Sequence, residues 1–521
     1  MKVCLLNDSF PPVIDGVANV VMNYGRIMQE ELGAEVLVGT PRYPGVDYDH
    51  YPYKVIAYPS LDTTGLISGY RTGNPLAMKE IDEMAHFWPE IIHSHCPAAS
   101  TVMARVLRNQ TGAPIVFTYH TKFDVDITRA VGDGFLQHRT IDAMVDNISA
   151  CDDVWVVSRG AGENLCSLGY EGDFIVMNNG VDFPRGRSSA DAVKAATKDF
   201  DLPEGVPVFL FVGRMMKYKG LPLIIDAMKY LSEGGFDFRM VFIGGGADAE
   251  EMHTKVRDLG LTLDLQGEDG KVSSLPGAAA SKGRVIFTGP IRDREKLRAW
   301  NTRADLFLFP SVYDTNGIVV REAAACGLAS VLINGSCAAE GITHTHNGYL
   351  IEETAESMAM LLMDACGNME CVHQVGQNAM DEIYISWEQA TRAAYERYGE
   401  LGELLRNGTL EKRRKERGEK ASDHLLDGAA TAADKVREFF DASRNFYEGM
   451  IGNVEDFGTE LKEELKEGLE ELRERIPEGV KEFGEKAKRL GENAQKGVKA
   501  GLEYAEKSMR EGFGMSDHAN E

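Results

Sequence analysis

The chain of 521 residues carries 56 basic and 81 acidic side chains, which gives a formal net charge of −25 at pH 7. Such an acidic chain repels phosphate backbones, so nucleic acid is not an expected partner. Hydrophobic residues make up 43% of the chain, no apolar run is long enough to span a bilayer, and the eight cysteines show no CxxC pairing that would indicate a metal site or a disulfide framework.

The N-terminal stretch, MKVCLLNDSFPP, has too short an apolar part for a signal peptide. Together with the cysteine pattern, this favours a reduced, cytoplasmic protein. The length is typical of two or three domains.

Short apolar runs alternate with helical patterns from the start of the chain. The run 3–6 predicts a strand, the loop 7–16 follows it, and 17–32 predicts a helix. Continuous apolar strands that alternate with helices indicate a parallel sheet covered on both faces. Further strands are expected at 35–40, 54–59, 90–95, 114–119, 153–158 and 173–178, and helices at 98–108 and 140–150.

The same alternation begins again at the strand-like run 208–213, followed by an expected helix at 221–231. The segment 265–282 is rich in glycine, serine and alanine and is expected to be a surface loop. Further strands are expected to begin near 239, 284, 306 and 330.

Two successive α/β series predict two doubly wound, Rossmann-like domains. We place them at 1–185 and 186–385, with a polar join at 179–204. In this architecture ligands bind at the carboxyl ends of the strands, here in the cleft between the domains.

The α/β alternation stops near residue 386. The sequence Ser386-Trp387-Glu388 is typical of a capped helix start, and we expect a crossover helix at 386–410. The remaining segment, 411–521, predicts a charged amphipathic tail, because its apolar positions recur at steps of three or four residues from Phe457 to Phe513.

The apolar stripe of the tail allows several interpretations. It could lie in a membrane interface, self-associate, or stay disordered until it binds a partner. Glycines recur in it at a spacing of about 11 residues, and each weakens a free helix by about 1 kcal/mol. The pattern therefore favours a surface-adsorbing or conditionally folded segment over a rigid coiled coil.

Two cations follow the strand at 208–213. Arg214 and Lys219 flank a strand-to-helix turn, where they can hold a diphosphate leaving group without a metal. A solvated turn is the alternative interpretation of the same residues.

Two carboxylates lie around a helix start in the stretch FPSVYDTNGIVVREAAACG, residues 309–327. Asp314 precedes the expected helix and Glu322 lies inside it. The free N–H groups and the positive dipole end of such a helix suit a phosphate. An ordinary turn with a solvated Asp and a surface Glu is the alternative.

Gly16 and His120 are weaker signals. Gly16 follows the loop after the first strand and lets the backbone approach a ligand, although turns need glycine in any case. His120, in the run Thr118-Tyr119-His120-Thr121, lies at the carboxyl end of a buried strand and faces the predicted cleft, although a lone His is most often structural.

These residues, in this order, resemble the GT-B glycosyltransferases of glycosyltransferase family 4, which are retaining enzymes that use nucleotide sugars. Arg214 and Lys219 match the family's GR-x4-K turn, while Asp314, Gly317 and Glu322 match its E-x7-E motif. The likeness covers residues 1 to about 405 and includes the runs NGVD (179–182), TYHT (118–121), FTGP (287–290) and SWE (386–388).

The resemblance implies that the first domain serves the acceptor side and the second the donor side, and it implies a role for each matched residue. Arg214 and Lys219 would bind the donor diphosphate, and Glu322 would hold the ribose hydroxyls. Asp314 and His120 would contact the donor sugar and form the catalytic pair. The remaining expected donor-binding residues are Gly16 at the phosphates, Pro290 and Ile291 at the base, and Gly317 and Ile318 at the helix start. No metal and no cofactor other than the nucleotide-sugar co-substrate is expected.

Two residues depart from the family pattern. Asp314 replaces the usual Glu and is one methylene shorter, and Asn316 replaces a common aromatic residue. Both bear on the identity of the sugar more than on the class of reaction.

The resemblance implies a retaining hexosyltransferase that uses a nucleotide sugar, with a UDP-sugar as the first expectation. The N-terminal half also resembles the diacylglycerol glucosyltransferases of the family, through the loop Pro12–Ala18 and the TYHT run. The expected acceptor is therefore a membrane lipid such as diacylglycerol, with the protein peripheral on the inner face of the cell membrane.

The alternatives are a transferase with a soluble or glycan acceptor and a non-catalytic sugar-nucleotide-binding scaffold. A Rossmann dehydrogenase is disfavoured, because the run Gly244-Gly245-Gly246 lacks the G-x-G-x-x-G spacing.

Overall fold

The computed structural model describes residues 1–63, 70–124, 127, 134–267, 269–278, 282–417, 426, 428 and 430. These residues belong to one compact unit, Met1–Ala430. Nearly all of the predicted tail, including its apolar stripe from Phe457 to Phe513, lies outside the described residues, so its interpretation stays a prediction. Within the described part of the chain, no helix is long and apolar enough to cross a membrane.

The first sheet has seven strands in the order β3-β2-β1-β6-β7-β8-β9, and all neighbours in it are parallel. Its inner strands are almost fully buried, as expected of a parallel sheet with helices on both faces. The strands are β1 (Lys2–Leu6), β2 (Glu35–Pro41), β3 (Lys54–Tyr58), β6 (Ile91–Ser94), β7 (Ile115–Tyr119), β8 (Asp153–Val156) and β9 (Ile175–Val176). A separate hairpin consists of β4 (Ser60–Asp62) and β5 (Arg71–Gly73).

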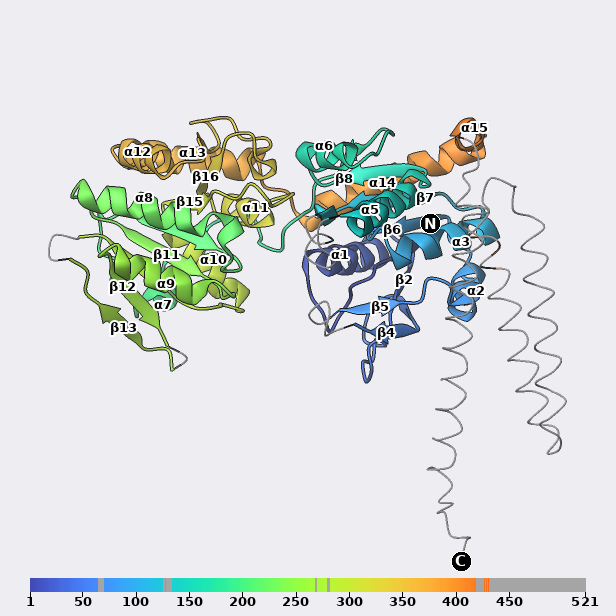
Figure 1. The fold of residues 1–521 in the computed structure, drawn as a ribbon, viewed down its shortest axis with the longest axis horizontal. Coiled ribbons are helices and arrows are strands. Elements are labelled where there is room, and N and C mark those ends of the chain that lie inside the picture. The colour runs from blue at the N-terminus through green and yellow to red at the C-terminus, as the bar shows by residue number, and fades with distance from the viewer. Residues whose placement is uncertain are drawn as a thin grey trace, which may run out of the picture. The chain divides into compact units, whose positions relative to one another are not determined.

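The helices of this half cover both faces of the sheet (Figure 1). One set, in which α3 contacts both α2 and α5, is formed by segments that connect successive strands. The helices are α1 (Gly16–Glu30), α2 (Met78–His86), α3 (Ala99–Thr111), α5 (Phe135–Ser149) and α6 (Arg159–Ser167).

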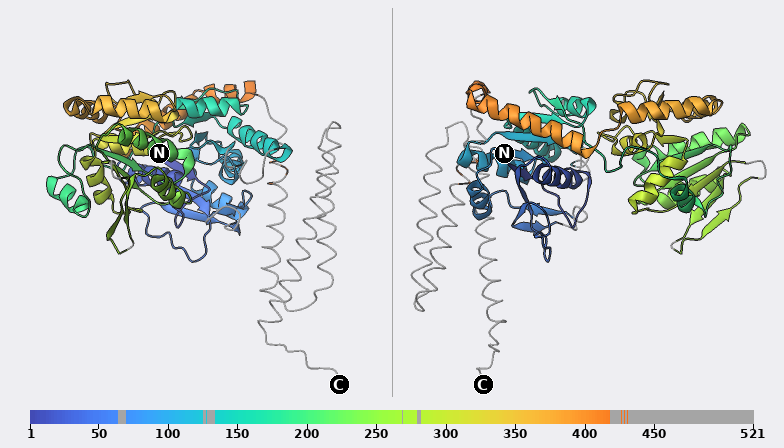
Figure 2. Two further views of the ribbon diagram at one scale, coloured as in Figure 1. Left: turned by 60° about the vertical axis from the view of Figure 1, so that its left-hand side comes forward. Right: turned by 180° about the vertical axis from the view of Figure 1, so that it is seen from behind.

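The last long helix of the described chain completes the first half. Helix α14 (Trp387–Arg406) starts at a capping box in which Ser386 and Gln389 bond each other's backbone N–H groups. It packs against α1 (Figure 2), and its buried residues Trp387 and Tyr398 join the same hydrophobic core as Trp155 of β8. A helix thus occupies most of the range 386–410, whose assignment as a crossover helix stays a prediction, and α15 (Thr409–Arg417) follows it.

The second sheet has eight strands in the order β13-β12-β14-β11-β10-β15-β16-β17. All its neighbours are parallel except β12 and β13. The strands are β10 (Val208–Val212), β11 (Arg239–Ile243), β12 (Thr262–Gln266), β13 (Val272–Leu275), β14 (Arg284–Phe287), β15 (Leu306–Phe309), β16 (Ala329–Ile333) and β17 (Tyr349–Ile351).

The prediction of a surface loop at 265–282 is wrong for 265–266 and 272–275, which lie in strands. β12 and β13 form an antiparallel hairpin with the register Leu263 to Leu275 through Gln266 to Val272. β13 reads VSSL and is mostly exposed, so it has little of the apolar pattern that identifies the inner strands. Its place at the edge of the sheet explains why a polar strand suffices there.

Helices also cover both faces of the second sheet (Figure 1). α8 contacts α9 and α12, while α10 contacts α7 and α11. The helices are α7 (Ala190–Thr197), α8 (Leu221–Glu233), α9 (Ala249–Asp258), α10 (Arg294–Arg303), α11 (Ile318–Ala325), α12 (Ala355–Ala365) and α13 (Met369–Glu382). The sheet topology agrees with the two predicted α/β series, and the residue boundaries assigned to the domains stay predictions.

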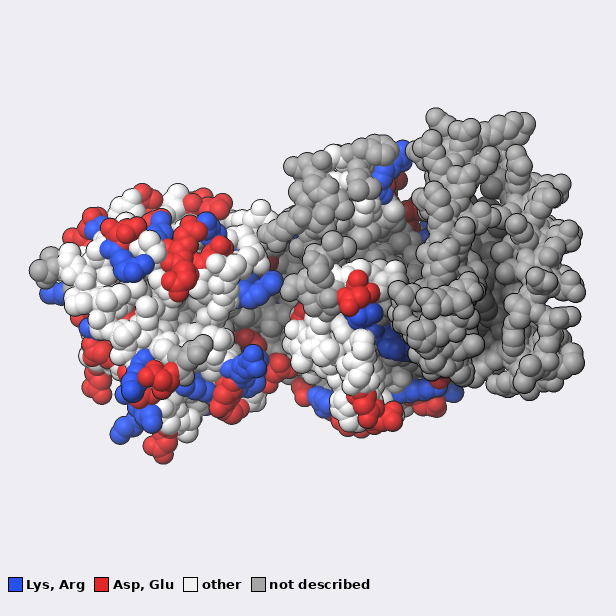
Figure 3. All heavy atoms as spheres, turned by 60° about the horizontal axis from the view of Figure 1, so that its bottom comes forward, with Lys and Arg blue, Asp and Glu red and all other residues white. Residues whose placement is uncertain are grey.

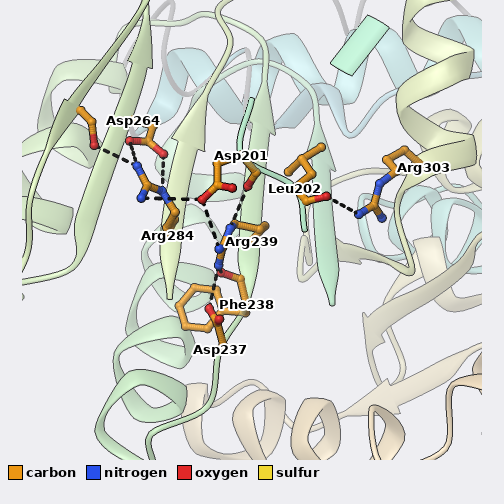
Figure 4. Close-up of polar contacts among 9 residues, drawn as sticks. Asp201, Leu202, Asp237, Phe238, Arg239, Asp264, Arg284 and Arg303 are labelled. Carbon is orange, nitrogen blue, oxygen red and sulfur yellow. Dashed lines mark hydrogen bonds and ion pairs between the residues drawn. The ribbon is translucent and has the colours of Figure 1, made fainter. Parts of the chain in front are cut away.

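A network of charged side chains, buried at Arg239 and Asp264 and exposed at Asp201, lies at the amino ends of β11 and β14 (Figure 4). Arg239, the first residue of β11, donates to the carbonyl of Asp201 at 2.9 Å, and Arg284, the first residue of β14, bonds Asp264 at 2.8 Å with both Nε and Nη2. The side chain of Asp201 also lies 3.4 Å from Arg239. This network lies where the strands of the second sheet begin, whereas the predicted site residues follow the ends of the strands.

Acidic and basic side chains are interspersed on the described face drawn in Figure 3, with neutral surface between them. Neither sign forms a continuous patch on that face. All eight cysteines are free, and four of them are buried: Cys4, Cys151, Cys326 and Cys337.

Candidate active site

The predicted site residues follow the carboxyl ends of parallel strands in both sheets. His120 directly follows β7, Arg214 follows β10, Pro290 follows β14 and Asp314 follows β15. Because parallel strands end at the same edge of their sheet, each sheet presents its share of these residues on one edge.

Lys219 and Asp314 form an ion pair at the edge of the second sheet. Nζ of Lys219 lies 2.7 Å from Oδ1 and 3.0 Å from Oδ2 of Asp314. Ser311 donates from Oγ to Oδ2 of the same carboxylate at 2.6 Å, which fixes its orientation. The ammonium also lies over the ring of Phe309, 5.4 Å from its centroid. The sequence assigned these two side chains to different parts of a donor, and the structure brings them into direct contact.

Gly220 is what allows this contact. Its φ is +79°, and a Cβ added to it would lie 2.4 Å from the carbonyl oxygen of Pro310. The turn that carries Lys219 therefore lies directly against the loop after β15, with no room for a side chain at position 220.

Arg214 lies on the exposed side of the same turn. Its Nη2 donates to the hydroxyl of Tyr218 at 3.3 Å. Burial and the carboxylate of Asp15 raise the pKa of Tyr70, and Arg214 acts on it in the opposite direction. Arg214 is thus electrostatically coupled to Tyr70, which sequence reasoning did not select, while no described contact joins it to Lys219.

The glycine run 244–246 has a packing role. Gly244 has φ +145°, and an added Cβ would lie 1.9 Å from the carbonyl oxygen of Gly213. Met215 and Gly245 share a backbone hydrogen bond of 3.0 Å. The backbone after β11 therefore packs on the backbone of the Arg214 turn.

Pro290 and Ile291 lie beside that glycine run. Pro290 is exposed, and its ring is the nearest neighbour of Gly245, 3.8 Å from the position of an added Cβ. Ile291 is half-buried against the core of the second sheet. The apolar side chain of Pro290 therefore lies beside the backbone of Gly245.

Helix α11 begins at Gly317 and Ile318. Gly317 has φ +57° and caps the helix in the left-handed conformation. Val320 donates to the carbonyl of Gly317 at 2.8 Å, so the N–H groups that this helix start leaves without an intrahelical acceptor are those of Ile318 and Val319. Beside it, Asn316 has its amide nitrogen and oxygen buried without hydrogen-bond partners in the described part of the chain.

Glu322 is buried in α11 and has a partner that sequence reasoning missed. Arg294 of α10 donates to Oε1 of Glu322, and it also lies 3.5 Å from Asp182. Burial raises the pKa of Glu322, and Arg294 acts in the opposite direction. Asp182 in turn accepts from Nε1 of Trp387 at 2.8 Å. The NGVD and SWE runs are therefore joined to Glu322 through one arginine.

Gly16 is the first residue of α1 and is exposed, with nothing within 4 Å of an added Cβ. The preceding Asp15 caps the helix by accepting from the N–H of Ala18 at 2.7 Å, and it also accepts from Tyr70 at 2.8 Å. Gly16 thus lies at an accessible helix start whose cap is negatively charged.

His120 is only 8% exposed and is held by a second histidine. Its Nε2 lies 3.0 Å from Nδ1 of His95. Burial lowers the pKa of His120 to about 4, against the opposing effect of Asp15. The ring is therefore neutral at neutral pH.

Two hydrogen bonds join the loop after β7 to the loop after β15. Thr315 donates from Oγ1 to the carbonyl of His120 at 2.5 Å, and Lys122 donates from Nζ to the carbonyl of Val312 at 3.3 Å. The two members of the predicted catalytic pair, His120 and Asp314, thus lie on loops that contact each other directly.

No group of three or more His, Cys, Asp or Glu side chains that could hold a metal ion occurs among the described residues. The expectation that the reaction needs no metal stays a prediction.

The sequence matches two family models over these halves. Residues 14–185 match the family described as Glycosyltransferase Family 4, and residues 193–381 match the one described as Glycosyl transferases group 1. Together the two matches cover more than half of the chain. The chain belongs to glycosyltransferase family 4, group 1.

Curated relatives agree with this family. The sulfoquinovosyl transferase SQD2 of Arabidopsis thaliana is 27% identical over 329 residues, which are 61% of this chain and 56% of that protein. A D-inositol 3-phosphate glycosyltransferase of Xylanimonas cellulosilytica is 28% identical over 247 residues, which are 46% of this chain and 54% of that protein. The chain thus spans about half the length of these two relatives.

Solved structures share the fold. HepE of Anabaena, in complex with UDP, superposes with a TM-score of 0.59 at 17% sequence identity, over 77% of this chain and 100% of that one. The expected family 4 architecture, two doubly wound Rossmann-like halves of the GT-B type, is confirmed.

Proposed function

We propose that this protein is a retaining glycosyltransferase that moves a hexosyl group from a nucleotide sugar to an acceptor hydroxyl. The observation that carries the proposal is the Lys219–Asp314 pair at the carboxyl edge of the second sheet, on a loop bonded to the one that carries His120. A cation paired with a carboxylate, on a loop bonded to the loop of a neutral imidazole, suits the cleavage of a sugar–phosphate bond.

The reaction needs stabilisation of charge on the leaving group. When the bond between C1 of the sugar and the diphosphate oxygen breaks, negative charge develops on the diphosphate. Lys219 has three donors, two of which already serve Asp314, and Arg214 offers a second cation on the same turn. Fixed donors of this kind typically contribute 10²- to 10³-fold each to the rate.

The remaining residues would bind the rest of the donor. Arg294 occupies Oε1 of Glu322, and the second carboxylate oxygen can accept from a ribose hydroxyl. The apolar surface of Pro290 and Ile291 suits a nucleotide base. The helix starts at Gly16 and at Gly317 with Ile318 offer backbone N–H groups to phosphate oxygens. No metal is needed in this arrangement.

Retention follows if the acceptor attacks from the face that the diphosphate leaves. The acceptor oxygen then forms its bond to C1, and its proton passes to the departing phosphate oxygen. Asp314 is already bound by Lys219 and Ser311, which argues against its use as a covalent nucleophile.

We infer a membrane lipid such as diacylglycerol as the acceptor, met at the inner face of the cell membrane. The support is the amphipathic pattern of the tail and the family likeness of the N-terminal half. A soluble or glycan acceptor and a non-catalytic scaffold are the competing interpretations.

A donor screen tests the reaction. HepE was also solved with UDP-glucose, which makes UDP-hexoses the first donors to try, followed by GDP- and ADP-sugars. A ligand at 100 times its dissociation constant stabilises a protein by about 2.7 kcal/mol, which a thermal shift detects. Stabilisation by a nucleotide sugar together with sugar transfer supports the proposal. Stabilisation without transfer to any acceptor supports the scaffold, and no stabilisation by any sugar nucleotide contradicts both.

Deletion of residues 431–521 tests the acceptor. This cut leaves α15 intact, whose Arg414 bonds Asp152 of the first half at 2.7 Å. We expect the shortened protein to lose binding to anionic lipid vesicles and transfer to diacylglycerol, while donor hydrolysis persists. Unchanged vesicle binding and unchanged transfer to lipid would contradict a membrane role of the tail.

A further inference from the structure

His95 and His120 form a hydrogen-bonded pair at the carboxyl edge of the first sheet. His95 directly follows β6 and His120 directly follows β7, and these two strands are parallel neighbours. Nδ1 of His95 lies 3.0 Å from Nε2 of His120, and the two rings are stacked with their centroids 5.3 Å apart. The two imidazoles therefore meet just beyond the ends of two neighbouring strands.

His95 is held in place by packing. It is 2% exposed, with the ring of His93 tilted against it at a centroid distance of 3.9 Å and the ring of Tyr24 edge-on at 6.1 Å. His93 does not compete for its nitrogens, because Tyr398 and Thr118 occupy both nitrogens of His93. The second nitrogen of His95, Nε2, is buried and has no hydrogen-bond partner in the part of the chain that the structure describes.

Both rings are neutral at neutral pH. Burial lowers the pKa of His95 well below its ordinary value and lowers that of His120 to about 4. A neutral imidazole carries one N–H and one acceptor nitrogen, so only two arrangements of the pair satisfy the hydrogen bond between them.

The two arrangements differ in what they leave on Nε2 of His95. If His120 donates from Nε2, then His95 must carry its own proton on Nε2, which leaves a buried N–H without an acceptor. If His95 donates from Nδ1, its Nε2 is a bare acceptor. Either arrangement leaves Nε2 of His95 unsatisfied, at a cost of about 1–3 kcal/mol, but among backbone groups orphaned buried N–H donors are rarer than under-satisfied acceptors. The second arrangement is therefore favoured.

We propose that His95 is a positioning residue that holds the proton of His120 on Nδ1 and so makes His120 a hydrogen-bond donor to the bound sugar. The hydrogen bond from His120 to the sugar rests on the proposed function, whereas the tautomer of His120 rests on the histidine pair alone. In the other tautomer, Nδ1 of His120 would present a lone pair, which could accept a proton from a hydroxyl.

The tautomer decides what His120 can do. A neutral N–H can donate to a sugar hydroxyl in the ground state and in the transition state, and it cannot take the acceptor's proton. The proton of the acceptor then has to leave by another path, in agreement with its transfer to the departing phosphate.

Long-range ¹H–¹⁵N spectra of the full-length protein labelled with ¹⁵N-histidine test the tautomer without any substrate. The signals of His95 and His120 are assigned from the spectra of His95→Leu and His120→Asn. We expect an Nδ1–H tautomer for both rings at pH 7.5. An Nε2–H signal for His120 would overturn the inference even in a fully active enzyme. The expected tautomer in a protein that transfers no sugar would support the inference about His95 and contradict the proposed function.

Variants of His95 test the consequence. His95→Asn keeps a donor near the position of Nδ1, His95→Asp offers only acceptors, and His95→Leu offers neither. We expect kcat to fall by about 10-fold or more in His95→Leu and further in His95→Asp, with the donor KM changed by less than about 3-fold, and His95→Asn to recover part of the loss. An equal kcat in the Asn, Asp and Leu variants would overturn the inference.

His93→Leu is the matched control, because His93 is equally buried on the same strand and does not touch His120. Its substitution is expected to lower stability and to leave the Nδ1–H signal of His120 in place. Loss of that signal in His93→Leu while His95 keeps its own Nδ1–H signal would overturn the role of His95.

Discussion

Nζ of Lys219 donates to both carboxylate oxygens of Asp314, at 2.7 and 3.0 Å. This contact joins the turn after β10 to the loop after β15, so the two motifs of the second half act as one unit. Substitution of either residue leaves the other without its charge partner in a largely buried place. Effects on activity and on stability must therefore be measured together.

Lys219→Ala is expected to lower kcat/KM for the nucleotide sugar by about 10²-fold or more, because the substitution removes a fixed cation that would stabilise the charge on the leaving diphosphate. Steady-state kinetics with the donor found in the screen measure the change. Lys217→Ala is the control: it lies in the same turn, is exposed and pairs with Glu251 at 2.6 Å. Equal losses in the two variants would contradict the assignment of Lys219.

Glu322→Ala is expected to weaken nucleotide binding by about 10-fold or more, since a hydrogen bond to a charged group contributes about 1.5–3 kcal/mol. Calorimetric titration with the free nucleoside diphosphate gives the affinity directly and does not need the acceptor. Glu295→Ala, an exposed residue of α10 that pairs with Arg298, is the comparison. An unchanged affinity in Glu322→Ala would contradict the assignment of Glu322 to the ribose hydroxyls.

Gly220→Ala is expected to destabilise the protein more than Gly205→Ala. Both glycines have similar φ values, +79° and +76°, so both variants carry the left-handed strain of about 1–2 kcal/mol. Only at Gly220 would the new Cβ meet the carbonyl of Pro310, at 2.4 Å, whereas nothing lies within 4 Å at Gly205. Urea unfolding of both variants compares the free energies, and similar midpoints would contradict the close approach.

His120 is expected to make the protein less stable in acid. Its pKa is about 4 in the folded state, against 6.5 for the free side chain, so between these values the unfolded state binds more protons. The free energy of unfolding then rises with pH through this window, by about 1.4 kcal/mol for each unit of pKa difference, and the contribution is complete above pH 6.5.

Unfolding curves at pH 4.5 and 7.5 measure this effect. His120→Asn should lose less stability on acidification than the unchanged protein, whereas His50→Asn, at an exposed position, should behave like the unchanged protein. The same pH dependence in all three proteins would contradict the burial of a neutral His120.

Most helices and strands could be predicted from the sequence because each is indicated by its own residues. The inner strands are continuous apolar runs, and the start of α14 carries its own capping residues. The hairpin of β12 and β13 was missed because an exposed edge strand such as VSSL needs no apolar pattern. Its pairing depends on Leu263 and Leu275, which the sequence does not show to be neighbours.

Site residues could be predicted from the sequence where two of them lie in one motif, as Arg214 and Lys219 do. The residues that contact the predicted site residues could not be predicted, because they come from distant segments. Arg294 reaches Glu322 from another helix, and Tyr70 reaches Asp15 across the first half. His95 was the one partner with a signal: it ends an apolar strand-like run, as His120 does, and two such ends on neighbouring strands meet.

The position of α14 in the chain sets the order in which the protein can be made. The last strand of the first sheet ends at Val176, but the core of this half also contains Trp387 and Tyr398, which come more than 200 residues later in the chain. At a synthesis rate of about 5–20 residues per second, the face of the sheet that α14 covers stays open for roughly 10–50 s while the second half emerges from the ribosome. During that interval the nascent chain exposes an apolar surface beside α1, and a chaperone that binds there would have to leave before α14 can dock.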